Sequence, residues 1–261
     1  MTGAERIAAA FAGSGKRAAL MPYLMGGFPD LDGSRAIGEA CAAAGADMLE
    51  LGVPFSDPLA DGPVIQAAGN AALRAGATLD GVLEVCRDLA PLVPVVVMCY
   101  ANLVFARGAG RFAASLAGAG ACGLIVPDLP HEEAPEVGEA CDGLGVALVP
   151  LVAPTTPEDR LAVIGAGARG FLYTVSVTGT TGEREEIAGG LREVVGRAAA
   201  HTDVPVAVGF GISTPRDAGL VADAGADGVI VGSRLVRIAA ESEDPAAAVG
   251  AAVAELGEGL R

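Results

Sequence analysis

Basic residues are scarce in this chain. Only 17 lysine and arginine residues stand against 32 acidic residues, which gives a formal net charge of −15 at pH 7. A protein must gather basic side chains to displace counterions from phosphate backbones, so this balance argues against nucleic acid or an anionic membrane as the partner. Solubility is the simpler explanation of the charge.

Lysine and histidine are nearly absent, and this narrows the possible chemistry. Lys16 is the only lysine and precedes the first expected strand, so neither a Schiff-base aldolase nor covalently held pyridoxal phosphate is expected. His131 and His201 are the only histidines and lie far apart in the sequence, so they do not indicate a metal cluster. The chemistry that remains possible is acid and base catalysis by carboxylates, without a metal or an organic cofactor in this chain.

The chain also lacks the signals of export and membrane insertion. Its N-terminus has no charged segment followed by an apolar one, so no signal peptide is expected. The most hydrophobic run, residues 89–106, is interrupted by Pro91, Pro94 and Asn102 and is typical of a buried strand rather than a membrane span. The five cysteines have no CxxC spacing, and an odd number suits a reducing compartment, so a cytoplasmic location is expected.

Four stretches of the chain echo one another. They are AGADMLELG from position 44, AGACGLIVP from 119, AGARGFLYT from 166 and AGADGVIVG from 224. Each has a helix end, a glycine that stops the helix and an apolar run too uniform for a half-exposed strand, which indicates parallel strands covered on both faces. With comparable runs added, strands are expected at 19–24, 47–52, 94–100, 123–128, 146–151, 170–176, 204–210 and 227–232.

Alanine-rich stretches with helical spacing separate these strands. Eight strand–helix units in 261 residues predict an α/β fold, a single (β/α)8 TIM barrel domain over residues 1–261. An open doubly wound sheet is the alternative, but it has fewer parallel strands at this length, and no GxGxxG opens the first helix. The capping-box spacing of Thr2 and Glu5 predicts an extra N-terminal helix over 2–12 that closes the barrel bottom. GSGK at 13–16 is a turn, because Arg17 stands where a Walker loop needs serine or threonine.

The stretch LELGVPFSDPLADGPVIQ, residues 49–66, carries a carboxylate at the end of an apolar run. Active sites of such barrels lie at the carboxyl ends of the strands, which directs attention to Glu50, Tyr100, Asp128 and Tyr173. An apolar setting raises the pKa of a carboxyl group toward the range useful for proton transfer. Asp61 supplies a second carboxylate. The alternative is an arginine-paired or rim-exposed Glu50.

Three glycine-bearing strand ends indicate a phosphate site. They are GTTG at 179–182, GFGIS at 209–213 and VGS at 231–233. Backbone N–H groups freed by glycine, with a helix N-terminus near Ser233, can hold a phosphate, and barrels use the loops after strands 7 and 8 for this. Each glycine singly could be only a turn, but their coincidence at consecutive strand ends favours the site.

These motifs, together with YANLVF at 100–105 and VPDLP at 126–130, resemble the tryptophan synthase alpha subunit family over about Pro22 to Arg237. The resemblance implies retro-aldol cleavage of indole-3-glycerol phosphate to indole and glyceraldehyde 3-phosphate in tryptophan biosynthesis. It also implies a beta-subunit partner that carries pyridoxal phosphate, in an alpha2beta2 heterotetramer.

Residue roles follow from the same resemblance. It implies that Glu50 is the principal acid and base, that Asp61 accepts the indole N–H, and that Tyr173 lines the site beside Glu50. The matching phosphate-binding positions are Gly182, Gly211, Gly232 and Ser233. The indole-pocket positions are Tyr23, Leu49 and Phe210, and those at the partner interface are Pro54, Asp57, Asn102 and Pro130.

Other functions remain open from the sequence. A free-standing indole-3-glycerol-phosphate lyase would share every one of these motifs, and a noncatalytic phosphate-binding barrel subunit is a further alternative because fold alone does not prove activity. An isomerase or cyclase of histidine biosynthesis would need catalytic side chains at the ends of strands 1 and 5, where MGGFP and LVAPT offer no carboxylate.

Overall fold

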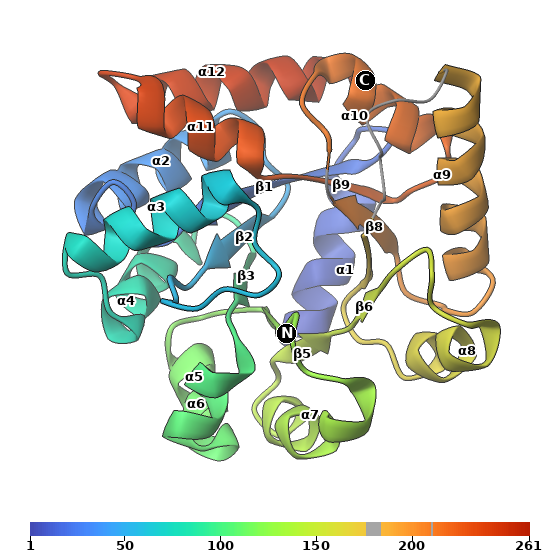
Figure 1. The fold of residues 1–261 in the computed structure, drawn as a ribbon, viewed down its shortest axis with the longest axis horizontal. Coiled ribbons are helices and arrows are strands. Elements are labelled where there is room, and N and C mark those ends of the chain that lie inside the picture. Colours follow the sequence, from blue (N-terminus) through green and yellow to red (C-terminus); the bar gives the residue numbers. More distant parts are fainter. Residues whose placement is uncertain (176–183, 210) are drawn as a thin grey trace.

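The protein folds into a barrel of parallel strands surrounded by helices (Figure 1). The structure is a computed structural model that describes residues 1–175, 184–209 and 211–261. One sheet has the order β5-β4-β3-β2-β1-β9-β8-β7-β6. Its strands are β1 (Ala19–Met25), β2 (Leu49–Gly52), β3 (Val95–Met98), β4 (Gly123–Ile125), β5 (Ala147–Val149), β6 (Leu151–Val152), β7 (Leu172–Val175), β8 (Val206–Gly209) and β9 (Gly228–Val231). The predicted TIM barrel is confirmed.

One expected strand differs from the prediction, because residues 146–151 form two segments with Pro150 between them. β5 pairs with β4, whereas β6 pairs with β7, so the strand changes neighbours at the proline. Proline has no N–H to donate to a ladder, but its carbonyl still can accept, and the Pro150 oxygen lies 3.0 Å from the Tyr173 nitrogen. The barrel therefore has nine described segments where eight strands were expected.

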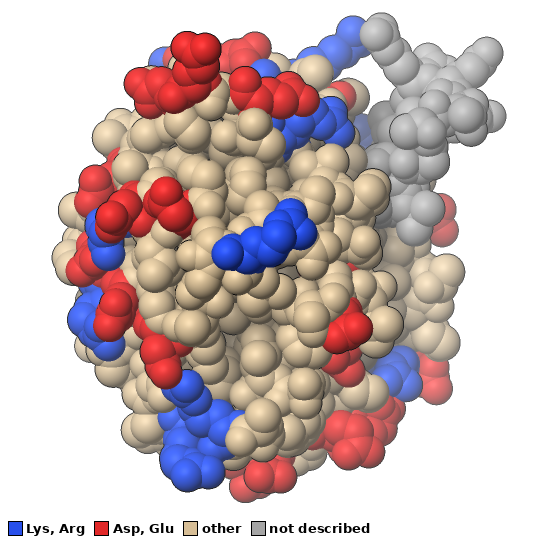
Figure 2. All heavy atoms as spheres, turned by 60° about the vertical axis from the view of Figure 1, so that its left-hand side comes forward, with Lys and Arg blue, Asp and Glu red and all other residues tan. Residues whose placement is uncertain are grey.

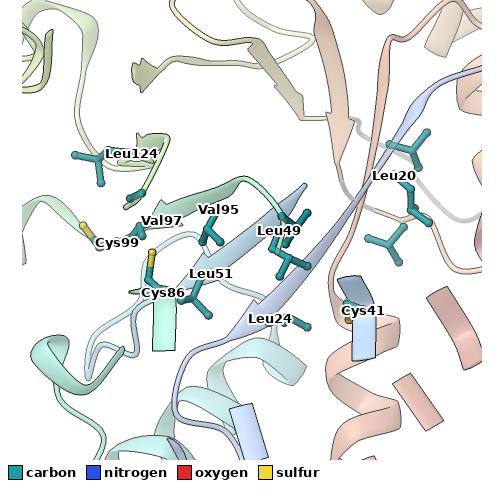
Figure 3. Packing of buried hydrophobic residues seen from close by; sticks show 14 of the residues in the cluster. Leu20, Leu24, Cys41, Leu49, Leu51, Cys86, Val95, Val97, Cys99 and Leu124 are labelled. Carbon is teal, nitrogen blue, oxygen red and sulfur yellow. The ribbon is translucent and has the colours of Figure 1, made fainter. Parts of the chain in front are cut away.

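Helices cover the outer face of the barrel. They are α2 (Leu31–Ala43), α3 (Pro63–Arg74), α4 (Leu79–Leu89), α5 (Ala101–Arg107), α6 (Ala109–Gly118), α7 (Pro135–Asp142), α8 (Glu158–Ala166), α9 (Arg184–Ala199), α10 (Pro215–Asp223), α11 (Ser233–Glu241) and α12 (Pro245–Glu258). Leu49 and Leu51 point into the apolar cluster under these helices, as Figure 3 shows. Because side chains alternate along a strand, Glu50 between them points into the barrel.

The N-terminal helix α1 (Gly3–Gly13) lies across the centre of the barrel (Figure 1). Its capping box joins Thr2 and Glu5 as predicted, with the Thr2 nitrogen donating to the glutamate at 2.7 Å. Ile7 is fully buried among the inward side chains of the strands. Arg6 donates to the carbonyls of Ala90 and Gly120, both at 2.9 Å, so one guanidinium ties the helix to two turns of the barrel bottom.

The single lysine has a structural place at this same end of the barrel. Lys16 Nζ lies 2.8 Å from Asp47 Oδ2, and both side chains are largely buried. The same carboxylate accepts a hydrogen bond from the Leu20 nitrogen at 2.7 Å. Both residues precede strands, so this ion pair lies at the end opposite to the one where barrel active sites form.

Charged residues are scattered over the surface. On the face seen in Figure 2, acidic and basic side chains form small separate groups around a broad, mostly uncharged area that one basic side chain crosses. Within the described residues, no helix is both long enough and apolar enough to cross a membrane.

The contact between α1 and the barrel gives a stability prediction. A Cβ added at Gly3 would lie 1.9 Å from the Cys122 carbonyl oxygen, whereas one added at Gly13 would meet nothing within 4 Å. Gly3→Ala should therefore lower the free energy of unfolding by about 1 to 3 kcal/mol through overpacking. Gly13→Ala, the matched control in the same helix, should be neutral or up to about 1 kcal/mol more stable. Denaturant unfolding measures both, and equal stability of the two variants would contradict the docking of α1.

Candidate active site

Glu50 is the buried centre of the site. Its side chain points into the barrel from β2, it is 0% exposed, and neither carboxyl oxygen has a hydrogen-bond partner among the described residues. Burial, and secondarily the charge of Asp61, raises its pKa to about 8. The alternative of a rim-exposed glutamate is therefore wrong, and no arginine among the described residues pairs with Glu50. At neutral pH this group holds a proton that it can give away.

Two tyrosines lie near Glu50, and each is placed by a glycine on the next strand. A Cβ added at Gly52 would lie 2.1 Å from the Tyr23 hydroxyl oxygen, and one at Gly209 would lie 2.2 Å from the Tyr173 hydroxyl oxygen. Burial raises both tyrosine pKa values well above the usual range. Charge adds to this, from Asp61 and then Glu50 for Tyr23, and from Glu50 for Tyr173. Both hydroxyls therefore stay neutral and can donate hydrogen bonds.

The loop after β2 carries the second carboxylate and is tied down at its far end. The Ala60 nitrogen donates to the Tyr100 hydroxyl at 3.0 Å, and the Gln66 side chain donates to the Asp61 carbonyl at 2.9 Å. Phe55 stacks on the Tyr100 ring with their centroids 5.3 Å apart. Contacts from Tyr100, at the start of α5, and from Gln66 of α3 thus hold the part of the loop that carries Asp61.

Asp61 has a different environment from Glu50. It is only partly buried; burial raises the pKa of its carboxyl, and the nearby Tyr100 hydroxyl lowers it by favouring the ionised form. Two carboxyl groups in such unequal surroundings suit one proton-donating and one charged role.

Tyr100 belongs to the site, although its sequence context indicated only a position at a strand end. It precedes α5, whose first nitrogen, on Ala101, donates to Asp128 Oδ1 at 2.8 Å. Asp128 follows β4, so this hydrogen bond links two consecutive strand ends and fixes the backbone beside Tyr100. The YAN and VPD spacing placed both residues at strand ends, but nothing in the sequence pairs them.

The glycine positions expected to bind phosphate lie near Tyr23 and after β8. Gly232 caps α11, which begins at Ser233, and a Cβ added to Gly232 would lie 3.4 Å from the Tyr23 ring. Gly211 has φ of +77°, a left-handed conformation that favours glycine, and it is exposed. Gly182 and Phe210 lie outside the described residues.

One expected position does not fit its assigned role, and a second is buried. Leu49 points outward into the cluster between the strands and the helices, so it cannot line an indole pocket inside the barrel; that prediction is wrong because strand alternation gives the inner face to Glu50. Pro54 is buried in the isolated chain, and its place at the partner interface stays a prediction.

The other expected interface residues are exposed: Asp57 and Pro130 lie in the loops after β2 and β4, and Asn102 lies in the first turn of α5. Leu59 and Phe105, which sequence reasoning missed, are 86% and 49% exposed near them in the chain. Over the described part of the chain, no group of three or more His, Cys, Asp or Glu side chains is arranged to hold a metal.

The burial of Glu50 predicts a pH-dependent stability. The raised pKa of about 8 means that the folded chain keeps a proton which the unfolded chain releases near its ordinary value of 4.5. Stability should therefore fall as pH rises between those values. Glu50→Gln does not titrate, so its stability relative to the parent should rise from pH 5 to 8 by on the order of 2 to 4 kcal/mol.

Denaturant unfolding at a series of pH values measures this difference. Glu84→Gln, the same substitution at an exposed position on α4, should stay within about 0.5 kcal/mol of the parent. A Glu50→Gln difference that does not vary with pH would mean that Glu50 ionises like an exposed glutamate.

Comparison with known proteins agrees with this geometry. A family model described as tryptophan synthase alpha chain matches residues 10–260. The tryptophan synthase alpha chain of Methanosarcina mazei is 48% identical over 229 residues, which cover 88% of this chain and 84% of that relative. That of Prochlorococcus marinus is 49% identical over 223 residues, covering 85% of this chain and 81% of its own length.

Solved structures agree as well. The tryptophan synthase subunit alpha from Legionella pneumophila has a TM-score of 0.90 at 35% identity, covering 100% of this chain and 98% of that one. A structure of Mycobacterium tuberculosis tryptophan synthase has a TM-score of 0.89 at 39% identity, covering 98% of each chain. This chain therefore belongs to the tryptophan synthase alpha chain family, whose members are lyases that cleave indole-3-glycerol phosphate.

Proposed function

We propose that this chain cleaves indole-3-glycerol phosphate to indole and glyceraldehyde 3-phosphate, with Glu50 as its acid and base. The observation that carries the proposal is the buried Glu50 carboxyl, which has no hydrogen-bond partner among the described residues and a pKa of about 8. A group with that pKa is protonated at neutral pH. Because its pKa is close to neutral, it can also accept a second proton later in the reaction.

The reaction needs two proton transfers, and Glu50 takes part in both. Glu50 donates its proton to C3 of the indole ring, so that the ring nitrogen becomes the electron acceptor. The bond between C3 and the glycerol chain then breaks, and its electron pair neutralises the ring. Glu50 takes the proton from the hydroxyl on the departing carbon as that oxygen becomes the aldehyde carbonyl. The carboxyl group ends protonated, and the two products together contain every atom of the substrate.

Asp61 stabilises the positive charge that develops on the indole ring. An ionised carboxylate that accepts the ring N–H stabilises the cation, and such a charge-assisted hydrogen bond is stronger than a neutral one. The Tyr100 hydroxyl favours the ionised form of Asp61 and so supports this role. Tyr173 adds a second neutral hydroxyl to the site, because burial and the charge of Glu50 raise its pKa.

The phosphate lies at the glycine-bearing strand ends. Gly232 and Ser233 provide the N-terminus of α11, where free N–H groups and the helix dipole favour an anion. Gly211, in its left-handed turn after β8, presents backbone to the same end of the barrel. Gly182 is assigned to this site by its motif alone.

The partner is a beta subunit that carries pyridoxal phosphate, in an alpha2beta2 assembly, and it docks on the face where the strands end. Asp57, Asn102 and Pro130 are exposed there, and the neighbouring Leu59 and Phe105 supply the apolar area that a protein interface needs. The chain works in the cytoplasm: its five cysteines are all free and buried, as suits a reducing compartment.

The assay is indole release from indole-3-glycerol phosphate while a beta subunit is titrated in. The parent chain should show saturable activation, and its kcat/KM should fall as pH rises through about 8, where Glu50 loses its proton. Glu50→Gln should lose about 10² to 10⁴ in rate because the amide keeps the shape and cannot transfer a proton. Glu84→Gln is the matched control.

Other results of this assay would support other functions. More than about a tenth of parent activity in Glu50→Gln would remove Glu50 from the mechanism. Full activity of the chain alone, with no activation, would favour a free-standing lyase. If the chain binds indole-3-glycerol phosphate but releases no indole under any condition, a noncatalytic subunit would be favoured.

The phosphate site is tested at Gly232. An aspartate there adds bulk and a like charge, so KM should rise by at least about tenfold, whereas Gly232→Ala, whose methyl makes ordinary contact with Tyr23, should raise it much less. Asp61→Asn should mainly lower kcat. An unchanged KM in Gly232→Asp would place the phosphate elsewhere.

A further inference from the structure

The Tyr23 hydroxyl is a polar group of the site that the proposed mechanism does not use. Tyr23 lies on β1 directly opposite Glu50 of β2, and its side chain is 8% exposed. Its ring lies against Gly232 on one side, and its hydroxyl lies over Gly52 on the other. The hydroxyl makes no hydrogen bond of standard geometry to a described residue. A buried phenol that served only as an apolar wall would leave that hydroxyl unused.

The position of this hydroxyl relates it to the loop that carries Asp61. Gly52, beneath the hydroxyl, is the last residue of β2 and the point where the loop begins. Ile65, in the apolar cluster that includes Tyr23, lies four residues beyond Asp61 at the start of α3. Tyr23 therefore contacts the region where the loop departs and packs in one cluster with the helix where it ends.

Three groups near Tyr23 could accept its proton. Glu50 is protonated at neutral pH, because burial raises its pKa to about 8. The Tyr100 hydroxyl already accepts the Ala60 nitrogen. Asp61 is the remaining acceptor, and its charge has the largest electrostatic effect on Tyr23, ahead of that of Glu50. A phenol donates more strongly to an ionised carboxylate than to a neutral group.

We propose that Tyr23 is a positioning residue whose hydroxyl donates a hydrogen bond to the Asp61 carboxylate when ligand is bound. Tyr23 from β1 and Tyr100, which caps α5, then hold that carboxylate between them, ionised and directed at the ring N–H of the substrate. Hydrogen bonds of this kind are often long in a ligand-free site and shorten when the ligand arrives. The role in catalysis rests on the proposed function, whereas the hydrogen bond itself does not.

The direct test follows the titration of Asp61 by NMR of chain labelled with 13C at the aspartate carboxyl. The Asp61 signal is identified by its loss in Asp61→Asn, and the probe is indole-3-propanol phosphate, which has no glycerol hydroxyls and cannot be cleaved. Loss of a donor to the ionised form raises a carboxyl pKa, so Tyr23→Phe should raise that of Asp61 by about 0.5 to 1 unit. The other groups facing Asp61, Glu50 and Tyr100, are unchanged in this variant.

Tyr173→Phe is the matched control. It removes a buried hydroxyl held over a glycine in the same way, but Tyr173 responds to Glu50 and Tyr23 rather than to Asp61. The Asp61 titration should therefore stay the same in that variant. An unchanged Asp61 titration in Tyr23→Phe would overturn the proposal, and so would an equal rise in Tyr173→Phe.

Kinetics with the beta subunit present give the second readout. Tyr23→Phe should lower kcat by about 3- to 10-fold, leave KM within about twofold, and move the acidic limb of kcat/KM to higher pH. In an Asp61→Asn background, the same substitution should have no further effect on kcat, because the hydroxyl acts through Asp61. A full additional loss in that background would overturn the proposal. If the parent chain releases no indole, the proposed function fails, while the NMR titration still decides the hydrogen bond.

Discussion

A carboxyl group sealed inside an apolar barrel, without a hydrogen-bond partner among the described residues, is the constraint on which the rest of the site depends. Burial opposes ionisation of Glu50 and so keeps a proton available at neutral pH. That effect lasts only while the surroundings stay dry and free of cations. The tyrosine rings over Gly52 and Gly209 provide neutral bulk near the carboxyl, and both arrangements require a residue without a Cβ on the neighbouring strand. A basic side chain in their place would ionise Glu50 and remove its proton.

The two carboxylates divide the work because they come from different kinds of structure. A residue in the middle of a short strand has its backbone fixed by ladders on both sides, and Glu50 is held in this way between β1 and β3. Asp61 lies in a loop, where burial raises the pKa of its carboxyl less completely than that of Glu50 because the side chain is only partly buried. The side chains of Tyr100, at the start of α5, and Gln66 of α3 set the place of this loop. Burial on a rigid strand therefore makes Glu50 a proton donor, and partial exposure in a tethered loop lets Asp61 carry a charge. The strain of an uncompensated buried acid is of the kind that folds tolerate at functional sites.

Most of the architecture was predictable because it follows from short-range patterns. The capping box of α1 and the repeated glycine-then-apolar runs predict the terminal helix and the parallel barrel, and the position of Glu50 follows from a carboxylate in an apolar strand. Leu49 was misassigned because its neighbour in sequence points to the other face, and two-residue alternation cannot be seen from motif matching alone. The role of Tyr100 could not be predicted, because its hydroxyl accepts a hydrogen bond from the backbone of Ala60, forty residues earlier in the chain. Contacts of that range depend on how strands are arranged in the barrel.

The break at Pro150 determines how the barrel is closed. Every other junction between described neighbouring strands is a ladder of hydrogen bonds that can open and reclose, but β5 and β6 are joined only by the chain itself. The sheet therefore has two edge segments, β5 and β6, and the backbone at Pro150 connects them covalently. Closure of the barrel at this point therefore relies on the covalent backbone at Pro150 rather than on a ladder between β5 and β6. The circular order of the strands is in this sense a property of one peptide linkage, and the edges that it hides are the ones that would otherwise be free to pair with another chain.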